Sequence, residues 1–374
     1  MPLWSDRRVL LCVGTGGVGK TTVSAAIALA AASRGLRTLV MTIDPARRLA
    51  NALGLSEFGN MEHEVSAEVL AKLGVELQGP LWAMMPDVKR TFDDLIARAA
   101  PDAERRDKIL RNRFYQRFST VLAGSLEYAA VEKLYEVYAS DRYDLIVLDT
   151  PPSQNATDFL QAPGRILDFL EQDTLQWILK PYGAAGRFSF KLLDVGSSFV
   201  FRSLGKLAGA ETIGQIVEMV LGFQGMYDGF RHRSTQVRQL LMSDEVAFVV
   251  VTSPQPAQRG SVRQLREGLH HEGMRVRAAV VNRVRQPPFG EVSAEIAMEE
   301  LRRAVADWPP EEASGVLEAL GEEVELWSRG QNSLGTLREV LGDTPVVELP
   351  ELPLDAHDLQ SLVALYGAFL ESDH

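Results

Sequence analysis

The sequence reads Gly14-Thr15-Gly16-Gly17-Val18-Gly19-Lys20-Thr21, or G-x-x-x-x-G-K-T, between an apolar run and an alanine-rich helical pattern. A glycine-rich turn that leaves a strand can point its backbone N–H groups at a phosphate, and the following helix aims its positive end at the same point. The lysine adds charge for the β- and γ-phosphates, and the threonine offers a hydroxyl to Mg²⁺. The stretch therefore predicts a nucleoside triphosphate site with Mg²⁺, in which the binding residues are Gly16, Gly17, Val18, Gly19, Lys20, Thr21 and Thr22.

The glycines of this loop also fit a second motif. They read G-x-G-x-x-G, and Asp44 follows where a dinucleotide-binding fold keeps its ribose-binding acid. A pyrophosphate between two nucleosides needs neither an ammonium group nor a magnesium-binding hydroxyl, whereas a terminal triphosphate needs both. Lys20 and Thr21 therefore favour a triphosphate over a dinucleotide.

Composition narrows the class of protein. The 374 residues include 50 acidic and 39 basic side chains, a net charge of -11, so the chain has no overall basic field that would attract nucleic acid. Cys12 is its one cysteine, which excludes an internal disulfide and a two-cysteine metal site within one chain. No run approaches the roughly 20 apolar residues of a membrane span, and no signal peptide is recognisable. We expect a cytoplasmic protein without direct membrane insertion.

The pattern of apolar runs indicates the fold class. Short, nearly continuous apolar runs are typical of parallel strands covered on both faces. Helical patterns at Lys20–Arg34 and Gln258–Glu272 separate several of them and give βαβ alternation. We predict an α/β fold, a P-loop NTPase with a doubly wound, mostly parallel sheet and the phosphate site at the carboxyl ends of its strands. The expected strands are Val9–Val13, Arg37–Ile43, Leu81–Met85, Leu145–Leu148, Val246–Thr252, Val276–Val281 and Pro345–Leu349.

Two long segments interrupt this alternation. They run from Thr91 to Ser140 and from Gly164 to Met242, are rich in helix-forming residues and contain no convincing strand. The simplest organisation is a helical subdomain inserted into the nucleotide-binding domain at two places. We therefore predict a P-loop domain of residues 1–90, 141–163 and 243–374, and an inserted helical subdomain of residues 91–140 and 164–242.

Two acidic residues follow predicted strands where such a site needs them. Asp44 is followed by Pro45, and an acid held by a stiff turn can position a water in line with the γ-phosphate. Asp44 could instead simply cap the next helix. Asp149 would hold Mg²⁺ through a coordinated water, and Thr150–Asn155 could sense the γ-phosphate. The candidate catalytic residues are Lys20, Asp44 and Asp149, and the candidate magnesium ligands are Thr21, Asp44 and Asp149.

The phosphate loop, the Asp-Pro-Ala turn at Asp44 and the Asp-Thr-x-Pro turn at Asp149, in this order, resemble the arsenite-pump (ArsA) ATPase family. That family includes the ATPase that guides tail-anchored membrane proteins. The resemblance runs from Val9 to the helix after Pro353. It implies ATP rather than GTP, because Asn282 matches an asparagine that reads adenine, although a turn residue is the plain alternative. It also implies a dimer whose closure on ATP moves the helical subdomains together.

The chain departs from the family pattern at three points. Many relatives have, at the position of Thr15, a lysine that reaches the partner's phosphates, and Thr15 carries no such charge. We therefore expect either a weakly self-activating homodimer or a heterodimer with a lysine-bearing paralogue. Gln154 and Asn155 stand where the family often has Gly and His, which affects the motion of that switch. The cysteine sites of relatives that bind zinc or a metalloid have no counterpart, because Cys12 stands alone.

These features lead to one functional hypothesis and two alternatives. An apolar helix surface from Ile213 to Phe230 could line a groove for an apolar client helix, although apolar helical spacing favours the core of the subdomain itself. The first hypothesis is an ATP-driven factor that handles or targets an apolar client or a membrane partner. The alternatives are the ATPase subunit of an anion or metalloid efflux system, and a slow regulatory ATP switch. The amphipathic C-terminal helix has an acidic face, which favours docking on the sheet over membrane binding.

Overall fold

The computed structural model describes residues 2–43, 48–55, 61–113, 115–116, 125–150, 219, 227–290, 292–352 and 358–371. The chain divides into two compact units, each built from segments that are distant in sequence. One unit comprises Met1–Met85, Ser140–Thr157 and Asp244–His374, and the other Pro86–Ala139 and Asp158–Ser243. The phosphate loop lies in the first unit. Asp44, most of the Thr150–Asn155 segment and most of the apolar surface from Ile213 to Phe230 lie outside the described residues.

An eight-stranded sheet forms the centre of the first unit, in the order β3-β4-β2-β5-β1-β6-β7-β8. All neighbouring strands pair in parallel except β3, which is antiparallel to β4. The predicted mostly parallel α/β sheet is thus confirmed. Its strands are β1 (Val9–Val13), β2 (Thr38–Thr42), β3 (His63–Glu64), β4 (Leu81–Met84), β5 (Leu145–Asp149), β6 (Val246–Thr252), β7 (Val276–Val284) and β8 (Val346–Pro350).

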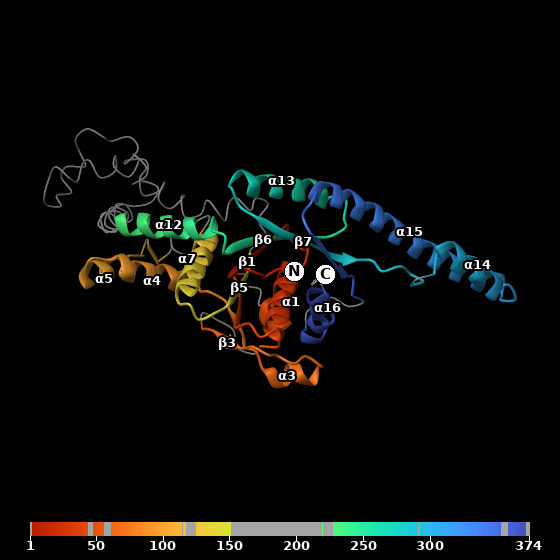
Figure 1. Ribbon diagram of the computed structural model, residues 1–374, viewed down its shortest axis with the longest axis horizontal. Helices are drawn as coiled ribbons and strands as arrows, with labels where there is room; N and C mark the ends of the chain where they lie inside the picture. Colours follow the sequence, from red (N-terminus) through yellow and green to blue (C-terminus); the bar gives the residue numbers. More distant parts are fainter. Residues whose placement is uncertain are drawn as a thin grey trace. The chain divides into compact units, whose positions relative to one another are not determined.

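Helices cover both faces of this sheet (Figure 1). Helix α1 (Lys20–Ser33) packs on β1, β2 and β5, and α16 (Leu359–Glu371) packs on α1 and β8. Helix α13 (Gln258–His271) covers β6 and β7 on the other face and contacts α15 (Pro310–Leu341). The short helices α2 (Arg48–Ala52) and α3 (Ala67–Lys72) lie between β2 and β4 in the sequence, and α14 (Ala294–Ala304) precedes α15.

Helix α1 is buried on nearly all sides. Every residue from Val23 to Ala32 is buried, because the helix lies between the sheet and α16. Small alanine side chains let the helix approach both neighbours closely, and a helix that is apolar all round is expected only where it is buried. Leu362, Leu365 and Phe369 of α16 are also buried. The predicted docking of the C-terminal helix is therefore confirmed, although most of its contacts are with α1 rather than with strands.

The described part of the second unit is helical. Its helices are α4 (Val88–Ala99), α5 (Ala103–Arg111), α7 (Ser125–Ala139) and α12 (Tyr227–Leu241). Phe92 stacks on Tyr128 with ring centroids 5.5 Å apart. The Glu132 carboxylate is fully buried and accepts hydrogen bonds from Arg233 at 2.8 Å and Arg98 at 3.3 Å. A buried carboxylate needs such partners, so these arginines hold α4, α7 and α12 together.

Three parts of the first unit differ from the sequence-based expectation. Strand β7 continues to Val284, so Asn282 lies inside the strand rather than closing it. Its pairing with β8 is irregular between Val281 and Val284, where Arg283 has a φ of 63°. The two-residue strand β3 was not predicted, because it has no apolar run. Helices α14 and α15 between β7 and β8 were not predicted either, and the 32 residues of α15 make it the longest helix among the described residues.

Candidate active site

The phosphate loop occupies the space between β1 and α1, as the sequence predicts. Strand β1 ends at Val13 and α1 begins at Lys20, so Gly14 to Gly19 connect them. A Cβ atom on Gly14 would lie 2.1 Å from the Val251 carbonyl oxygen of β6, so only glycine fits there. The first turn of α1 has neither an acidic residue nor a side-chain cap. Its N–H groups and the helix dipole therefore favour an anion at this end.

Asn282 touches this loop from β7. Its Nδ2 atom donates a hydrogen bond to the Val18 carbonyl oxygen at 2.9 Å, and its side chain is buried. Gly19 has a φ of 91°, and a Cβ atom there would lie 2.2 Å from Asn282 Nδ2. Asn282 thus packs directly against the last residues of the loop. The family resemblance implied a contact with adenine for this residue, which stays a prediction, and it did not reveal the contact with the loop.

Lys20 folds back over the loop. Its ammonium group donates to the carbonyl oxygens of Gly14 at 3.0 Å and Thr15 at 2.9 Å. The side chain is mostly buried, which is rare for a lysine. These contacts hold a positive charge at the start of the loop, close to where the predicted phosphates would lie.

Thr21, Thr42 and Asp149 meet beside the first turn of α1. The Thr21 hydroxyl donates to Asp149 Oδ2 at 2.7 Å, and the Thr42 hydroxyl donates to the same oxygen at 2.8 Å. Asp149 and Thr42 are buried, and the register of the parallel strands β2 and β5 pairs them directly. Thr42 was missed by the sequence reasoning. The signal that could have found it is its position at the end of a strand next to the strand that carries Asp149.

This group of oxygen atoms fits a magnesium ion. Hydroxyl and carboxylate oxygens are the ligands that Mg²⁺ prefers, and it is usually held by one or two carboxylates, waters and substrate phosphates. Within the described ranges, no three His, Cys, Asp or Glu side chains lie close enough together to form a metal site. The third predicted ligand, Asp44, lies outside those ranges. The donors that the structure brings together are thus Thr21 and Asp149.

Thr150 ties the end of β5 to the end of β1. Its hydroxyl donates to the Cys12 carbonyl oxygen at 2.8 Å. The Cys12 side chain is fully buried, and this burial raises the pKa of its thiol to about 12. At neutral pH Cys12 is therefore a neutral residue of the core. Thr150 is the one residue of the predicted γ-phosphate sensor that falls within the described ranges.

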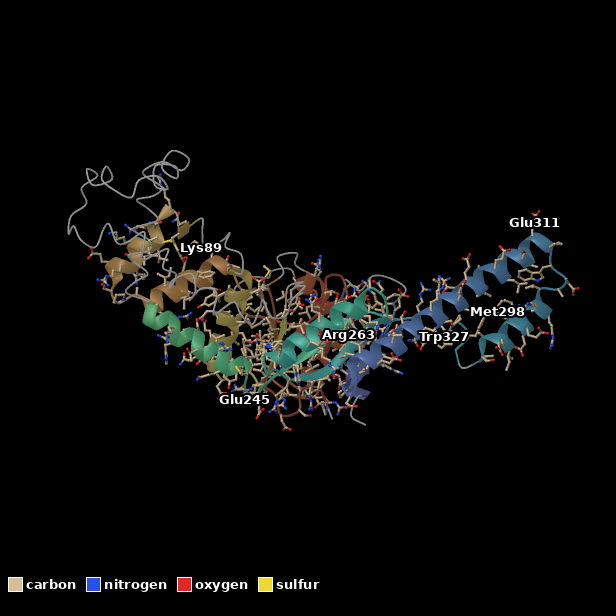
Figure 2. The ribbon with its side chains drawn as sticks, turned by 90° about the horizontal axis from the view of Figure 1, so that it is seen from above. Lys89, Glu245, Arg263, Met298, Glu311 and Trp327 are labelled. Atoms are coloured by element: carbon tan, nitrogen blue, oxygen red, sulfur yellow. The ribbon has the colours of Figure 1, made fainter. Side chains whose placement is uncertain are left out.

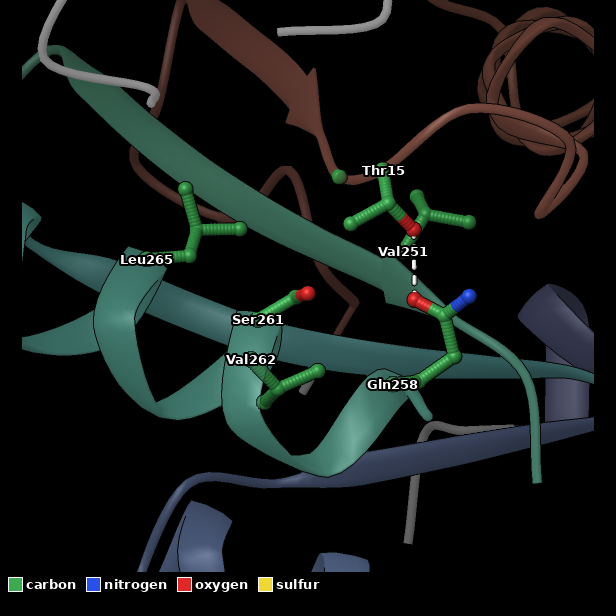
Figure 3. A pocket seen from close by; sticks show the side chains of 7 residues that line it. Thr15, Val251, Gln258, Ser261, Val262 and Leu265 are labelled. Atoms are coloured by element: carbon green, nitrogen blue, oxygen red, sulfur yellow. Dashed lines mark hydrogen bonds between the residues drawn. The ribbon is translucent and has the colours of Figure 1, made fainter. Parts of the chain in front are cut away.

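Thr15 contacts α13 rather than pointing away from the chain. Its hydroxyl donates to Gln258 Oε1 at 2.5 Å, as the dashed line in Figure 3 shows. The two side chains border a small pocket between the loop and α13, which is lined by Gly14, Thr15, Val251, Gln258, Ser261, Val262 and Leu265. Gln258 is a second residue that the sequence reasoning did not connect with the site.

The parallel sheet and the glycine-rich loop between β1 and α1, with its lysine and threonine, define a P-loop nucleoside triphosphatase. Comparison with known families agrees with this class. The family described as anion-transporting ATPase, ArsA, matches residues 7–291. The chain belongs to this family. The resemblance noted in the sequence is thereby confirmed.

Individual relatives are more distant. An uncharacterized protein of Streptomyces coelicolor is 29% identical over 282 residues, which cover 74% of this chain and 62% of that protein. The ATPase ARSA1 of Chlamydomonas reinhardtii is 26% identical over 75% of this chain and 35% of its own length. The ATPase GET3C of Arabidopsis thaliana is 25% identical over 75% of this chain and 68% of its own length. The chain thus spans less than two thirds of the first two of these relatives.

Proposed function

We propose that the chain is a Mg²⁺-dependent ATPase that works as a dimeric switch and couples ATP turnover to the handling of an apolar client or a membrane partner. One observation carries the first part of this proposal. The Thr21 hydroxyl at the start of α1 and the Asp149 carboxylate at the end of β5 meet at 2.7 Å beside the phosphate loop. That pair supplies the oxygen ligands for the metal ion of a nucleoside triphosphate.

The residues of the chain have separate roles in this mechanism. The loop N–H groups and the first turn of α1 bind the phosphates, and the Lys20 ammonium neutralises charge on the β- and γ-phosphates. Thr21 would bind Mg²⁺ directly and Asp149 through a water, while Thr42 holds the Asp149 carboxylate in place. When bound, Mg²⁺ neutralises charge that develops on the phosphate oxygens. Asp44 is proposed to orient the attacking water.

The switch is proposed to begin at Thr150. This residue lies directly after Asp149 and is held by the Cys12 carbonyl oxygen. A change in the metal or phosphate contacts of Asp149 would therefore alter the position of Thr150, at the start of the following segment. The order of the Thr150–Asn155 segment is proposed to depend on the γ-phosphate.

The dimer remains part of the proposal. Thr15 brings no charge to a second site, and its hydroxyl is bonded to Gln258 of the same chain. We therefore propose either a homodimer with slow hydrolysis or a heterodimer in which a paralogue supplies the lysine. Size measurement with ATP and Mg²⁺ tests this point. A chain that pairs only with itself and turns over as fast as a lysine-bearing relative excludes the heterodimer.

The family description as anion-transporting ATPase favours one alternative function, the energising subunit of an efflux system. Cys12 is the only cysteine and its side chain is fully buried, so this chain offers no accessible thiol as a ligand for a metalloid. Within the described ranges, no helix is both long and apolar enough to span a bilayer. In this alternative, we propose that a separate membrane protein forms the path for the anion.

The decisive experiment compares wild type with Lys20→Ala in ATP binding and hydrolysis, with Lys72→Ala on α3 as the matched control. We expect Lys20→Ala to lower hydrolysis by about a hundredfold or more, because it removes a charge that stabilises the transition state. Lys72→Ala should bind and hydrolyse ATP as wild type does. Intact hydrolysis in Lys20→Ala would show that the site assignment is wrong.

The same assay separates the candidate partners. Hydrolysis is measured alone, with oxyanions including arsenite, and with hydrophobic helical peptides. Stimulation by the peptides supports client handling, and stimulation by an oxyanion supports the efflux alternative. Slow hydrolysis that neither addition changes supports a regulatory switch. Chelation of Mg²⁺ with EDTA should stop hydrolysis in every case.

A further inference from the structure

Residues 292–330 form a helical arm that contains none of the residues of the proposed ATPase site. The arm consists of α14 and the first two thirds of α15, and it lies outside the segment that matches the family, which ends at residue 291. Helix α15 contacts α13 and α14, and from α13 it runs outward beyond the sheet (Figure 1). Met298, Glu311 and Trp327 lie along this arm in Figure 2.

The burial of α15 changes along its length. Near its C-terminal end, Leu334, Leu337, Val340 and Leu341 are buried against the rest of the unit. The same apolar spacing of three and four residues continues into the arm, but there Leu317, Leu320, Val324 and Trp327 are only partly buried. None of the residues of α14 is buried. Two helices alone therefore leave the apolar side of the arm incompletely covered.

Exposed apolar side chains are concentrated in this arm. Eight large hydrophobic residues are notably exposed among those that the structure describes, and four of them, Val292, Ile296, Trp308 and Leu326, belong to these 39 residues. Ile296 is 58% exposed and Leu326 is 41% exposed. Single exposed apolar residues are ordinary, but several of them on one protruding element favour an interaction surface. A third helix packed along the arm would cover it.

The charge of the arm selects the kind of partner. Residues 292–330 contain ten acidic and three basic side chains, a net charge of -7 within a chain whose total is -11. The three basic residues are already paired inside the arm, Arg302 and Arg303 with Glu299 and Arg329 with Glu325. Seven acids form no ion pair with the described residues, because only Glu299, Glu323 and Glu325 are paired; the seven are Glu295, Glu300, Asp307, Glu311, Glu312, Glu318 and Glu322. Two such arms would repel each other, and an anionic membrane would repel the arm.

We propose that this arm is a docking site for a basic amphipathic helix of a partner protein. The apolar stripe of that helix packs along the partly buried positions of α15, near Val324 and Leu326. Its lysine and arginine side chains lie opposite the unpaired acids of the arm. A helix laid against an apolar face and flanked by complementary charge is a known mode of recognition, in which the charges set orientation and association rate.

The probe for this site is a labelled peptide of about 18 residues, or about five helical turns. Its leucines form one stripe and its other positions are lysine. Three comparison peptides keep the length: one with glutamate in place of lysine, one with glutamine, and one with the lysines and leucines scrambled so that no stripe forms. Binding to the full chain is measured by fluorescence anisotropy at low and physiological salt. The amphipathic lysine peptide should bind most tightly and should weaken with added salt.

Variants in the arm separate its two contributions. Ile296→Gln combined with Leu326→Gln removes exposed apolar contacts, and Glu318→Lys combined with Glu322→Lys reverses charge. Each pair should weaken binding by about tenfold or more. Because all four side chains are exposed, the fold should not change. The matched controls outside the arm are Met242→Gln, which is 49% exposed, and Glu68→Lys combined with Glu76→Lys, and they should bind as wild type does.

The proposal is overturned if the scrambled peptide binds as well as the amphipathic one, or if the arm variants bind as tightly as the controls. It is also overturned if sedimentation shows that the chain pairs with itself through the arm and that Leu326→Gln abolishes this pairing. These measurements do not depend on ATP hydrolysis. A failed docking proposal therefore leaves the proposed ATPase site untouched.

Discussion

Gly19 stands where the phosphate loop becomes α1, and its conformation links two elements. Its φ of 91° belongs to the left-handed region, and its missing side chain leaves the space that Asn282 Nδ2 occupies. Two separate physical requirements therefore act on one residue. The cost of a side chain there is backbone strain together with a clash.

Gly19→Ala should accordingly destabilise the loop and abolish ATP binding. Gly17→Ala is the matched control, because Gly17 has a similar φ of 78° but nothing within 4 Å of an added Cβ atom. We expect Gly17→Ala to be milder by about 1 kcal/mol or more in the free energy of unfolding. The measurements are urea unfolding and equilibrium binding of ATP. Equal losses in the two variants would show that Asn282 does not press on the loop.

Cys12 should be unreactive in the folded protein. Burial raises its pKa to about 12 and the side chain is fully buried, so very little of the reactive thiolate forms at pH 8. A colorimetric thiol reagent should detect no thiol in native protein and one thiol per chain in urea. Because the chain has one cysteine, the signal has one source. Rapid labelling of native protein would contradict the buried position of β1.

The sequence motifs predicted some residues of this site and did not identify the others. Lys20, Thr21 and Asp149 belong to short motifs, in which a few adjacent residues indicate the chemistry of the site. Thr42 and Gln258 belong to no motif, and their roles depend on the register of β2 with β5 and on the packing of α13 near the loop. Asp44 stays a prediction, because it lies outside the described residues.

At the scale of elements, the strands were the easiest to predict. Runs such as Val246–Thr252 are apolar throughout, because helices cover both faces of a parallel sheet, and the predicted bounds of β1 and β6 agree with the structure. Helix α15 was missed because its sequence pattern is weak. Its low-propensity glycines weaken the helical pattern, and they occur at Gly315, Gly321, Gly330 and Gly335.

One of these glycines offers a test of α15. Gly335 is exposed, lies beside the buried Leu334 and Leu337, and has nothing within 4 Å of an added Cβ atom. Gly335→Ala should raise the free energy of unfolding by roughly 0.5–1 kcal/mol, because alanine loses less backbone entropy in a helix. Urea unfolding followed by circular dichroism measures the change.

Gly342→Ala is the contrasting variant. Gly342 follows α15 with a φ of 60°, and an added Cβ atom would lie 3.3 Å from Arg266 Nη1. Its replacement should destabilise the chain. If Gly335→Ala is instead destabilising, α15 does not continue through this residue as a regular helix.

At the scale of the whole molecule, an ion pair joins strands of the sheet at the edge opposite the phosphate site. Arg37 and Asp144 precede β2 and β5, and Arg37 Nη2 lies 2.7 Å from Asp144 Oδ1. The Arg37 backbone N–H donates to Asp144 Oδ2 at 2.8 Å. The hydrogen bonds from the Arg37 side chain and backbone hold the pKa of Asp144 below its usual value, although partial burial opposes them.

This lowered pKa gives stability a defined pH dependence. A carboxylate whose pKa is lower in the folded state stabilises the fold above its unfolded pKa of about 4, and that contribution is lost as the pH falls through the folded pKa. Asp144→Asn should therefore be slightly less stable than wild type at pH 7, and the two should converge below pH ~4. Urea midpoints between pH 7 and pH 3 measure the difference. A constant difference over this range would contradict the ionised pair.

The sequence by itself determined the phosphate loop, the alternation of strands and helices, and the family. Each of these can be recognised from a short stretch of sequence, because a motif or a run of apolar residues is local and does not depend on contacts with distant residues. Only the tertiary structure decided which side chains surround the loop, because Thr42, Gln258 and Asn282 reach their partners from 107, 243 and 264 positions away. It also decided that the apolar spacing of α15 is covered at one end and open at the other. The burial of a helix depends on which elements pack against it, and the local sequence pattern does not indicate those elements.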